Sequence, residues 1–232
     1  MRALILAAGR GERMRPLSDA TPKPLLAAGG RRLIEWQIRA LAAAGIRELV
    51  INTAHLAPQF EESLGDGGRL GVAIVWSREG DVAADALETL GGIVRALPLL
   101  GDGPFAVVSG DIVSGFDYAT LTPRAAAIAA GAADAHLVLV PNPAFHAQGD
   151  MGLEQGLIAP DAVPRFTYAN IAVFAPRLFA GLAPVHARLF PWLYDAARAG
   201  RVTGEVFDGR WYNVGTPREL ERLDRELAAR PL

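Results

Sequence analysis

The sequence predicts an α/β fold in which a Rossmann-like, mostly parallel sheet is flanked by helices. Two observations carry this prediction. Short apolar runs typical of buried strands alternate with stretches of helical periodicity up to residue 140. The first apolar run, at 2–8, breaks into a glycine-rich loop, which is the usual place for a ligand in such a sheet. We expect a single domain over 1–232, with a first part at 1–140 and a second part at 141–232.

The individual elements follow from periodicity and from their end signals. Gly45 and Pro98 are expected to end helices, and Thr216 is expected to cap the last helix before Pro217. The predicted strands are 2–8, 47–53, 72–76, 104–109, 135–140 and 202–207, and the predicted helices are 32–44, 57–64, 89–97, 117–130, 187–199 and 217–229.

The pattern changes after residue 141. Proline, glycine and short apolar segments dominate through residue 175, which is typical of hairpins rather than of βα units. No flexible linker separates the two parts. We therefore expect an insertion, or lid, that packs on the first part of the sheet.

Composition excludes several classes of protein. The chain has 232 residues, is 51% hydrophobic and 21% charged, and carries a net charge of −2, which is typical of a globular domain. The absence of a basic stripe argues against nucleic acid as a partner. No apolar run approaches a membrane span. Without any cysteine the chain has no disulfide and no cysteine-bound metal, which suits a cytoplasmic location.

The loop after the first strand has the composition of a polyphosphate site. Gly9 and Gly11 let backbone N–H groups approach phosphate oxygens, and the loop also carries three arginines and Lys23. The lysine stands twelve residues after Gly11 with no Ser or Thr behind it, so this is no P-loop. Met14 stands where a dinucleotide fingerprint needs its third glycine, and three prolines exclude a long helix behind the loop.

These residues resemble those of a known family. The pattern L-A-A-G-x-G-x-R-M-x-P-L from Leu6 to Leu17, followed by P-K-P-L from Pro22 to Leu25, resembles the signature of the sugar-1-phosphate nucleotidylyltransferases. The resemblance covers essentially the whole chain. Supporting stretches are 87–93, 109–112, 140–143, 148–153 and 213–217.

The resemblance implies an activity and its partners. The oxygen of a sugar 1-phosphate attacks the α-phosphorus of a nucleoside triphosphate, and pyrophosphate leaves. The nucleophile is already an anion, so the site must hold two polyanions and stabilise developing charge, with Mg²⁺ as the implied cofactor. Residues 1–140 are then the nucleotide-binding part and 141–232 the sugar-binding part. Within the family, the resemblance favours a uridylyltransferase of cell-wall sugar recycling that uses UTP.

The resemblance also assigns residues. Arg13, Lys23 and Asp111 are the implied catalytic residues, and Asp111 follows the strand at 104–109, on the same sheet edge as the glycine loop. The implied metal ligands are Asp111 and Asn213. The implied nucleotide-binding residues are Ala8, Gly9, Gly11, Glu12, Arg13, Lys23, Glu88 and Thr89, and the implied sugar-binding residues are Asn142, Gly149, Asp150 and Asn170.

Two positions depart from the commoner family pattern. Asn213 stands where many relatives have an aspartate ligand, which removes one negative charge from the metal site. Leu90 replaces a small residue in the segment that begins at Glu88, where the glycines either contact the nucleotide or only let the helix approach the sheet. Arg10 and Arg15 are either phosphate contacts or solvated side chains.

Several alternatives remain open at this point. The sugar phosphate is alternatively that of mannose or glucose, with GTP or dTTP as the nucleotide. A non-catalytic nucleotide-sugar sensor is the alternative from another class. The four histidines (His55, His136, His146 and His186) are too scattered for a zinc site, and we interpret them as structural or surface residues. The sequence is compatible with a monomer or a small homo-oligomer.

Overall fold

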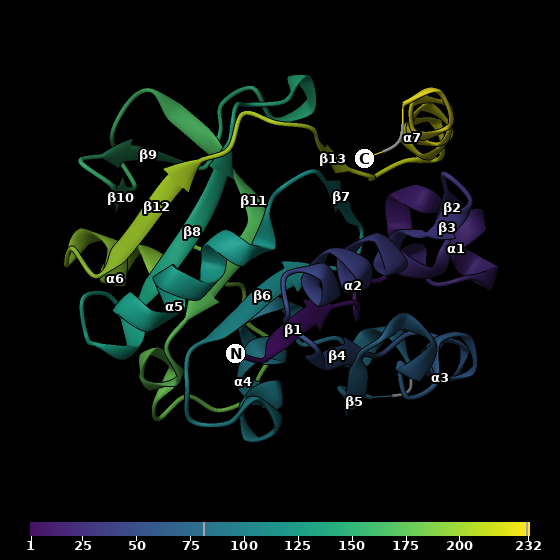
Figure 1. Cartoon of the computed structure of the whole chain (residues 1–232), viewed down its shortest axis with the longest axis horizontal. Helices are drawn as coiled ribbons and strands as arrows, with labels where there is room; N and C mark the ends of the chain where they lie inside the picture. The colour runs from purple at the N-terminus through teal and green to yellow at the C-terminus, as the bar shows by residue number, and fades with distance from the viewer. Residues whose placement is uncertain (81, 231) are drawn as a thin grey trace.

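The computed structural model describes residues 1–80, 82–230 and 232. Its centre is a nine-stranded mixed sheet with the strand order β5-β4-β1-β6-β11-β8-β12-β10-β9 (Figure 1). Both parts of the chain contribute strands to this one sheet. The α/β class predicted from the sequence is confirmed.

The first four strands of that order form a parallel half-sheet. Strand β1 lies between β4 and β6, and β5 extends the sheet beyond β4. Because the strands run in parallel, their carboxyl ends meet at one edge, where the glycine loop begins. The bounds are β1 Ala3–Leu6, β4 Glu48–Thr53, β5 Ala73–Arg78 and β6 Phe105–Ser109.

The remaining strands run in mixed directions. The long strand β11 is antiparallel to β6 on one side and to β8 on the other, and β12 is parallel to β8. The hairpin β9–β10 closes the far end, and β9 also pairs with the start of β11. The bounds are β8 Ala135–Val140, β9 Met151–Glu154, β10 Leu157–Ala159, β11 Arg165–Phe174 and β12 Val202–Val206.

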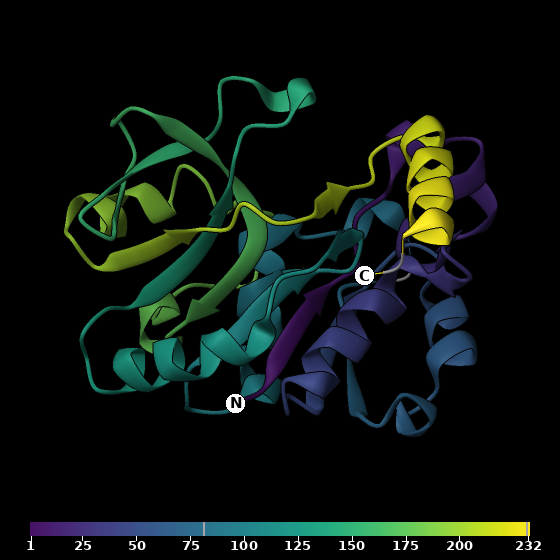
Figure 2. The same cartoon turned by 45° about the horizontal axis from the view of Figure 1, so that its top comes forward.

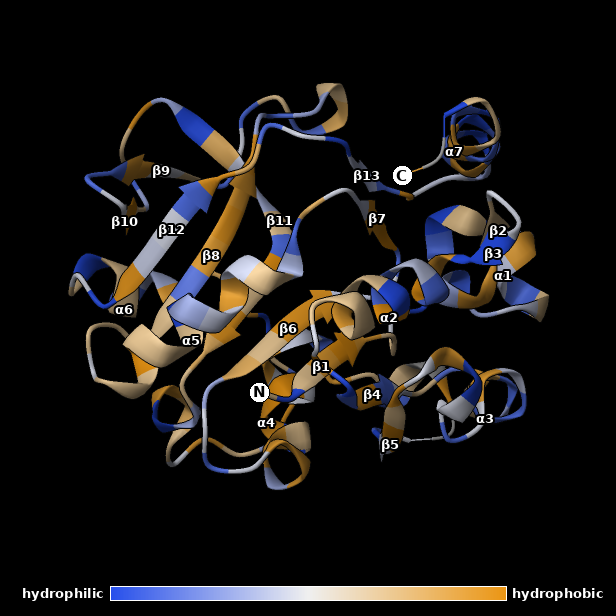
Figure 3. Cartoon of the chain, viewed as in Figure 1, coloured by the Kyte–Doolittle hydropathy of each residue, from blue (hydrophilic) through white to orange (hydrophobic). Residues whose placement is uncertain are grey.

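Helices cover both faces of the sheet because alternate strand residues are buried on opposite sides. In β1, Ala3 and Ile5 belong to the core under α2, α3 and α5, whereas Leu4 belongs to the core under α4 and α6. Strands β1, β6 and β8 are mostly hydrophobic in Figure 3, as strands buried on both faces are. The bounds are α2 Leu33–Ala43, α3 Ala57–Leu64, α4 Glu88–Leu100, α5 Leu121–Ala129 and α6 Leu193–Arg198.

The C-terminal segment returns to two places in the first part of the chain, 1–140. Strand β13 (Trp211–Asn213) pairs with β7 (Ile112–Ser114), and helix α7 (Pro217–Ala229) lies beside the hairpin β2–β3 (Figure 2). The N–H of Gly29 donates to Asp224 Oδ1 at 2.8 Å. The small elements there are α1 Leu17–Ala20, β2 Ala27–Ala28 and β3 Arg31–Arg32.

Most predicted elements are confirmed within a few residues, including the Thr216 cap, whose side chain accepts from the N–H of Glu219. Two predictions are wrong. Helix α4 continues past Pro98 to Leu100, because Leu100 is buried in the core and a proline in the last turn removes only one helical hydrogen bond. Residues 187–192 do not continue α6, because Ala187 exchanges hydrogen bonds with the start of α4 instead.

Across the residues that the structure describes, we find no helix long and apolar enough to cross a membrane.

Candidate active site

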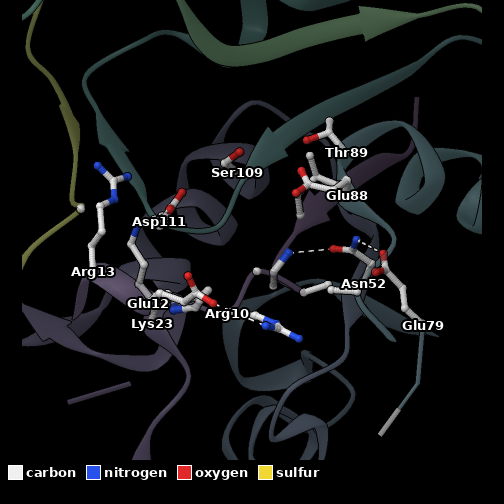
Figure 4. Close-up of a pocket in the computed structure, with 18 of the residues that line it drawn as sticks. Arg10, Glu12, Arg13, Lys23, Asn52, Glu79, Glu88, Thr89, Ser109 and Asp111 are labelled. Atoms are coloured by element: carbon white, nitrogen blue, oxygen red, sulfur yellow. Dashed lines mark hydrogen bonds and ion pairs between the residues drawn. The ribbon is translucent and has the colours of Figure 1, made fainter. Parts of the chain in front are cut away.

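A cavity of about 780 Å³ opens at the carboxyl ends of β1, β4 and β6 (Figure 4). Asp111 and all of the nucleotide-binding residues implied by the resemblance line it. Further lining residues include Arg10, Asn52, Glu79, Ser109, His186 and Gly215. The sequence therefore predicted which segments meet at this edge of the sheet.

The glycine loop forms one wall of the cavity. Gly11 has φ +63°, and a Cβ there would approach the Cβ of Lys23 to 3.1 Å, so both conformation and space call for glycine. The hydroxyl of the buried Ser18 donates to the carbonyl of Gly11 at 2.8 Å and holds this turn. Gly9 has nothing within 4 Å of a hypothetical Cβ, so its backbone faces open space beside the cavity.

Lys23 and Asp111 meet in the cavity. Lys23 stands between Pro22 and Pro24 and begins a single 3-10 turn (Lys23–Leu25). Only 8% of the residue is exposed. Its Nζ lies 2.5 Å from Asp111 Oδ2, the carboxylate that follows β6. The chain thus places an ammonium and a carboxylate side by side although 88 residues separate them.

The three loop arginines differ in their surroundings. The Arg13 guanidinium lies beside Gly215, whose hypothetical Cβ would come within 3.2 Å of the arginine Cζ. Arg10 lines the cavity and also forms an ion pair with Glu12 at 3.4 Å. Arg15 is exposed and pairs with Asp19 at 3.1 Å, outside the cavity lining. Arg13 and Arg10 are therefore placed for phosphate contacts, and Arg15 is a solvated side chain.

The start of α4 forms the opposite wall. Glu88, the first residue of the helix, has φ +61°, a conformation that L residues rarely adopt and that is often found at binding sites. Behind it, a Cβ on Gly91 would meet the Val185 carbonyl oxygen, and one on Gly92 would lie 2.5 Å from Glu79 Oε1. These two glycines let the helix approach its neighbours, whereas Glu88 and Thr89 line the cavity.

Sequence reasoning missed Asn52, Glu79, Ser109 and His186. Asn52 is the penultimate residue of β4, Ser109 is the last residue of β6, and Glu79 follows β5, so the rule that drew attention to Asp111 applied to them as well. Burial raises the pKa of Glu79 above its usual range, although hydrogen bonds from Leu87 and Asn52 oppose this. His186 is an exposed residue, as expected, but it lines the cavity, and no sequence signal indicated that.

The predicted metal ligands are neighbours in the fold. Asn213 pairs with Ile112 across β13 and β7, and Val214 N donates to the Asp111 carbonyl at 3.5 Å. Asp111 lines the cavity and Asn213 does not. Within the described ranges no three His, Asp or Glu side chains gather as a metal cluster. One carboxylate in the cavity lining nevertheless fits Mg²⁺, which binds few protein carboxylates and takes phosphate and water oxygens as its other ligands.

The four predicted sugar-binding residues lie outside the cavity lining. Asn142 donates to the carbonyls of Ala147 and Arg165, and both carboxylate oxygens of Asp150 have partners, His146 Nε2 at 2.9 Å and Tyr168 N at 2.8 Å. Gly149 has φ +62° and packs against Asn142.

Asn170 is set apart by its place in a strand. It has φ +57° and lies where the register between β11 and β8 is irregular.

Chemically, the cavity brings together what transfer between two phosphates needs. Arg10, Arg13 and Lys23 supply positive charge, the loop supplies backbone N–H groups, and Asp111 supplies an oxygen ligand.

Comparison with known proteins gives one family and several relatives. The family model described as nucleotidyl transferase matches residues 2–161. The chain is 44% identical to an N-acetylmuramate alpha-1-phosphate uridylyltransferase of Neisseria meningitidis, over 93% of this chain and 94% of that one. It is 33% identical to the protein of the same name from Caulobacter vibrioides, over 97% and 96% of the two chains.

A solved structure has the same fold. It is that of a putative glucose-1-phosphate thymidylyltransferase from Bacillus anthracis, crystallised with sucrose. The TM-score is 0.82 at 19% identity, with 98% of this chain and 95% of that chain covered.

Proposed function

Since this chain belongs to the nucleotidyl transferase family, we propose that it transfers the uridylyl group of UTP to N-acetylmuramic acid α-1-phosphate. The products are UDP-N-acetylmuramic acid and pyrophosphate. Identity of 44% along nearly the full length of a uridylyltransferase of that name supports this substrate pair. The structural observation that carries the proposal is the contact of Lys23 with Asp111 inside a cavity walled by the glycine loop.

The reaction needs placement and charge stabilisation rather than a general base. A phosphate oxygen of the sugar phosphate forms a bond to the α-phosphorus of UTP, and the bond from that phosphorus to the β-phosphate bridging oxygen breaks. The electron pair of the broken bond leaves with pyrophosphate. Both reactants are anions, so the protein must hold them against their mutual repulsion.

The proposed roles follow from position in the cavity. Lys23 stabilises charge on the α-phosphate, and Arg13 stabilises the β- and γ-phosphates and the leaving pyrophosphate. The N–H groups around Gly9 and Gly11 complete the phosphate contacts. Glu88 and Thr89, on the opposite wall, contact the nucleoside.

Magnesium is the proposed cofactor. Asp111 would hold it, with Asn213 as the second candidate ligand. When bound, the cation neutralises phosphate charge and polarises the α-phosphate.

The second part of the chain, 141–232, is the proposed sugar-binding part. Asn142, Gly149 and Asp150 are engaged with each other or with nearby backbone and side chains, so we propose that they shape the loop that faces the sugar. Asn170 remains the candidate for direct contact with the sugar.

The proposal also includes a setting. We propose that the protein acts in the cytoplasm, as a monomer or small homo-oligomer, in peptidoglycan recycling.

A pyrophosphate-release assay over a grid of substrates tests the proposal. UTP, GTP and dTTP are each combined with the 1-phosphates of N-acetylmuramic acid, glucose and mannose, in the presence of Mg²⁺. We expect the highest kcat/KM for UTP with N-acetylmuramic acid 1-phosphate. A preference for mannose or glucose 1-phosphate would change the substrate assignment. If no combination of substrates releases pyrophosphate, a nucleotide-sugar sensor is favoured.

A further inference from the structure

Four segments meet at the cavity through one chain of hydrogen bonds, of which Figure 4 shows the bond between Asn52 and Glu79. The N–H of Ala7, just after β1, donates to Asn52 Oδ1 at 2.7 Å. Asn52 Nδ2, at the end of β4, donates to Glu79 Oε1 at 2.5 Å. The N–H of Leu87, just before α4, donates to Glu79 Oε2 at 2.7 Å. Two side chains thus connect the glycine loop to the start of α4.

Only one arrangement of donors and acceptors satisfies this chain. Both of its ends are backbone N–H groups, which can only donate. The two side chains between them must therefore supply three acceptors and one donor. An ionised carboxylate at Glu79 and an amide at Asn52 do so, with the amide oxygen turned toward Ala7.

The surroundings leave little room for another arrangement. Asn52 is 2% exposed, so an unpaired amide there would be costly. A Cβ on Gly92 would lie 2.5 Å from Glu79 Oε1 and 2.7 Å from Asn52 Nδ2, so helix α4 lies directly against the pair.

Asn52 and Glu79 connect the two walls of the cavity. Ala7 leads into Gly9 and Gly11, and Leu87 leads into Glu88, the residue with φ +61°. A non-glycine residue keeps such a backbone conformation only when its surroundings fix it. The hydrogen bond from Leu87 to Glu79 fixes the backbone one residue before it.

We propose that Asn52 and Glu79 are positioning residues that set the distance and orientation between the glycine loop and the start of α4, and thereby place the nucleoside triphosphate for transfer. This inference rests on the proposed function in that it takes a nucleoside triphosphate as the ligand. A misplacement of about 1 Å in such a site reduces turnover by about 100-fold. Because both side chains also line the cavity, direct contact with the substrate is the competing role.

A reversed pair separates the two roles. In Glu79→Gln a single acceptor replaces two, so one donor loses its partner. In Asn52→Asp two carboxylates face each other. The double variant Asn52→Asp/Glu79→Gln again supplies three acceptors and one donor: the new carboxylate accepts from Ala7 and from the new amide, whose oxygen accepts from Leu87. The net charge equals that of the wild type.

Each single variant should lower kcat/KM for the nucleoside triphosphate by at least about tenfold, with changes in both KM and kcat. The double variant should return to within about threefold of the wild type. Hydrogen exchange at the amides of Ala7 and Leu87 should accelerate in the single variants and slow again in the double variant. Glu62→Gln, which removes an exposed carboxylate from α3, is the matched control and should behave as wild type.

A double variant no more active than the weaker single variant would overturn the inference, since it would mean that charge at position 79 acts on the substrate. Full activity in both single variants would also overturn it. Thermal unfolding checks that every variant folds, and a double variant that does not fold counts against the pairing because it retains all three hydrogen bonds. Failure of the proposed function differs: wild-type protein would then transfer no uridylyl group, while the exchange pattern would still report on the pair.

Discussion

The ammonium of Lys23 lies 2.5 Å from the carboxylate of Asp111 in a cavity at the carboxyl ends of three parallel strands. The side chains are 10% and 25% exposed, so solvent screens this pair only in part. Both groups are proposed to act on the same substrate, one on phosphate and the other through a cation. On this proposal, the phosphates of a magnesium-bound triphosphate compete with Asp111 for Lys23, and its cation competes with Lys23 for Asp111.

The first prediction concerns the lysine. Lys23→Ala should reduce kcat by about 100- to 1,000-fold, because it removes a charge aimed at the transferring phosphate. The measurement is steady-state pyrophosphate release. Arg15→Ala is the matched control, since Arg15 is an exposed cation of the same loop outside the cavity lining, and it should keep wild-type rates. A wild-type kcat in Lys23→Ala would show that the lysine does not contribute to catalysis.

The second prediction concerns the metal. Asp111→Asn should raise the Mg²⁺ concentration for half-maximal rate by about tenfold or more, because a neutral oxygen replaces a carboxylate. Asn213→Asp should lower that concentration, since it adds a second negative charge beside the first. Both are read from initial rates in a Mg²⁺ titration at fixed nucleotide. A response of Asp111→Asn alone would restrict the metal site to one protein ligand.

The third prediction separates binding from folding at a glycine. A Cβ at Gly9 meets nothing within 4 Å in the protein but would stand where phosphate is proposed to bind. Gly9→Ala should therefore raise KM for UTP by about tenfold or more, with a melting temperature within about 2 °C of wild type. Gly103→Ala is the matched control: Gly103 is also exposed and unobstructed, but it lies outside the cavity lining. An unchanged KM in Gly9→Ala would argue against a phosphate at this loop.

The fourth prediction concerns stability and pH. Burial lowers the pKa of His136 from its usual 6.5, although Glu205 Oε1, 3.6 Å from its Nε2, opposes this, and Arg124 adds to the lowering. Its Nδ1 faces the Thr203 hydroxyl at 2.9 Å. Below pH 6.5 the unfolded chain takes up a proton at this histidine that the folded chain resists. The contribution of His136 to the free energy of unfolding should therefore be fully present above pH 6.5 and be lost as the pH falls toward the lowered pKa.

For one proton the loss cannot exceed about 1.4 kcal/mol per pH unit. Denaturant unfolding of wild type and His136→Asn at pH 7.5 and pH 5.5 measures it. The variant, which cannot titrate at this position, should lose less stability between the two pH values. Equal losses would mean that the buried ring accepts a proton without penalty.

Local patterns were enough to predict the strands, the glycine loop and the edge of the sheet at which the cavity opens. Buried parallel strands are continuous apolar runs, and Gly11 and Pro22 to Pro24 constrain the backbone wherever the rest of the chain lies. The resemblance to sugar-1-phosphate nucleotidylyltransferases is confirmed by the family match over residues 2–161 and by the full-length relatives.

Features that depend on packing between distant segments were not predictable in this way. The hydrogen bond between Asn52 and Glu79 is one example, because it forms only once β4 is placed beside β1 and β5 beside β4. Asn142 lies between two prolines, which indicated a loop but not the hydroxyl of Thr167, 25 residues away, that donates to its side chain. Helix α4 passes Pro98 because burial of Leu100 outweighs a local signal.

The contact of Gly29 with Asp224 has a consequence for biosynthesis. The two residues are 195 positions apart in the sequence, so the β2–β3 hairpin is synthesised and leaves the ribosome long before α7. Until then the apolar surface that receives Leu223 and Leu227, which includes Met14 of the loop, faces water. The nascent chain therefore exposes a patch suited to chaperone binding, and a messenger truncated before the α7 codons would yield a polypeptide prone to aggregation and proteolysis.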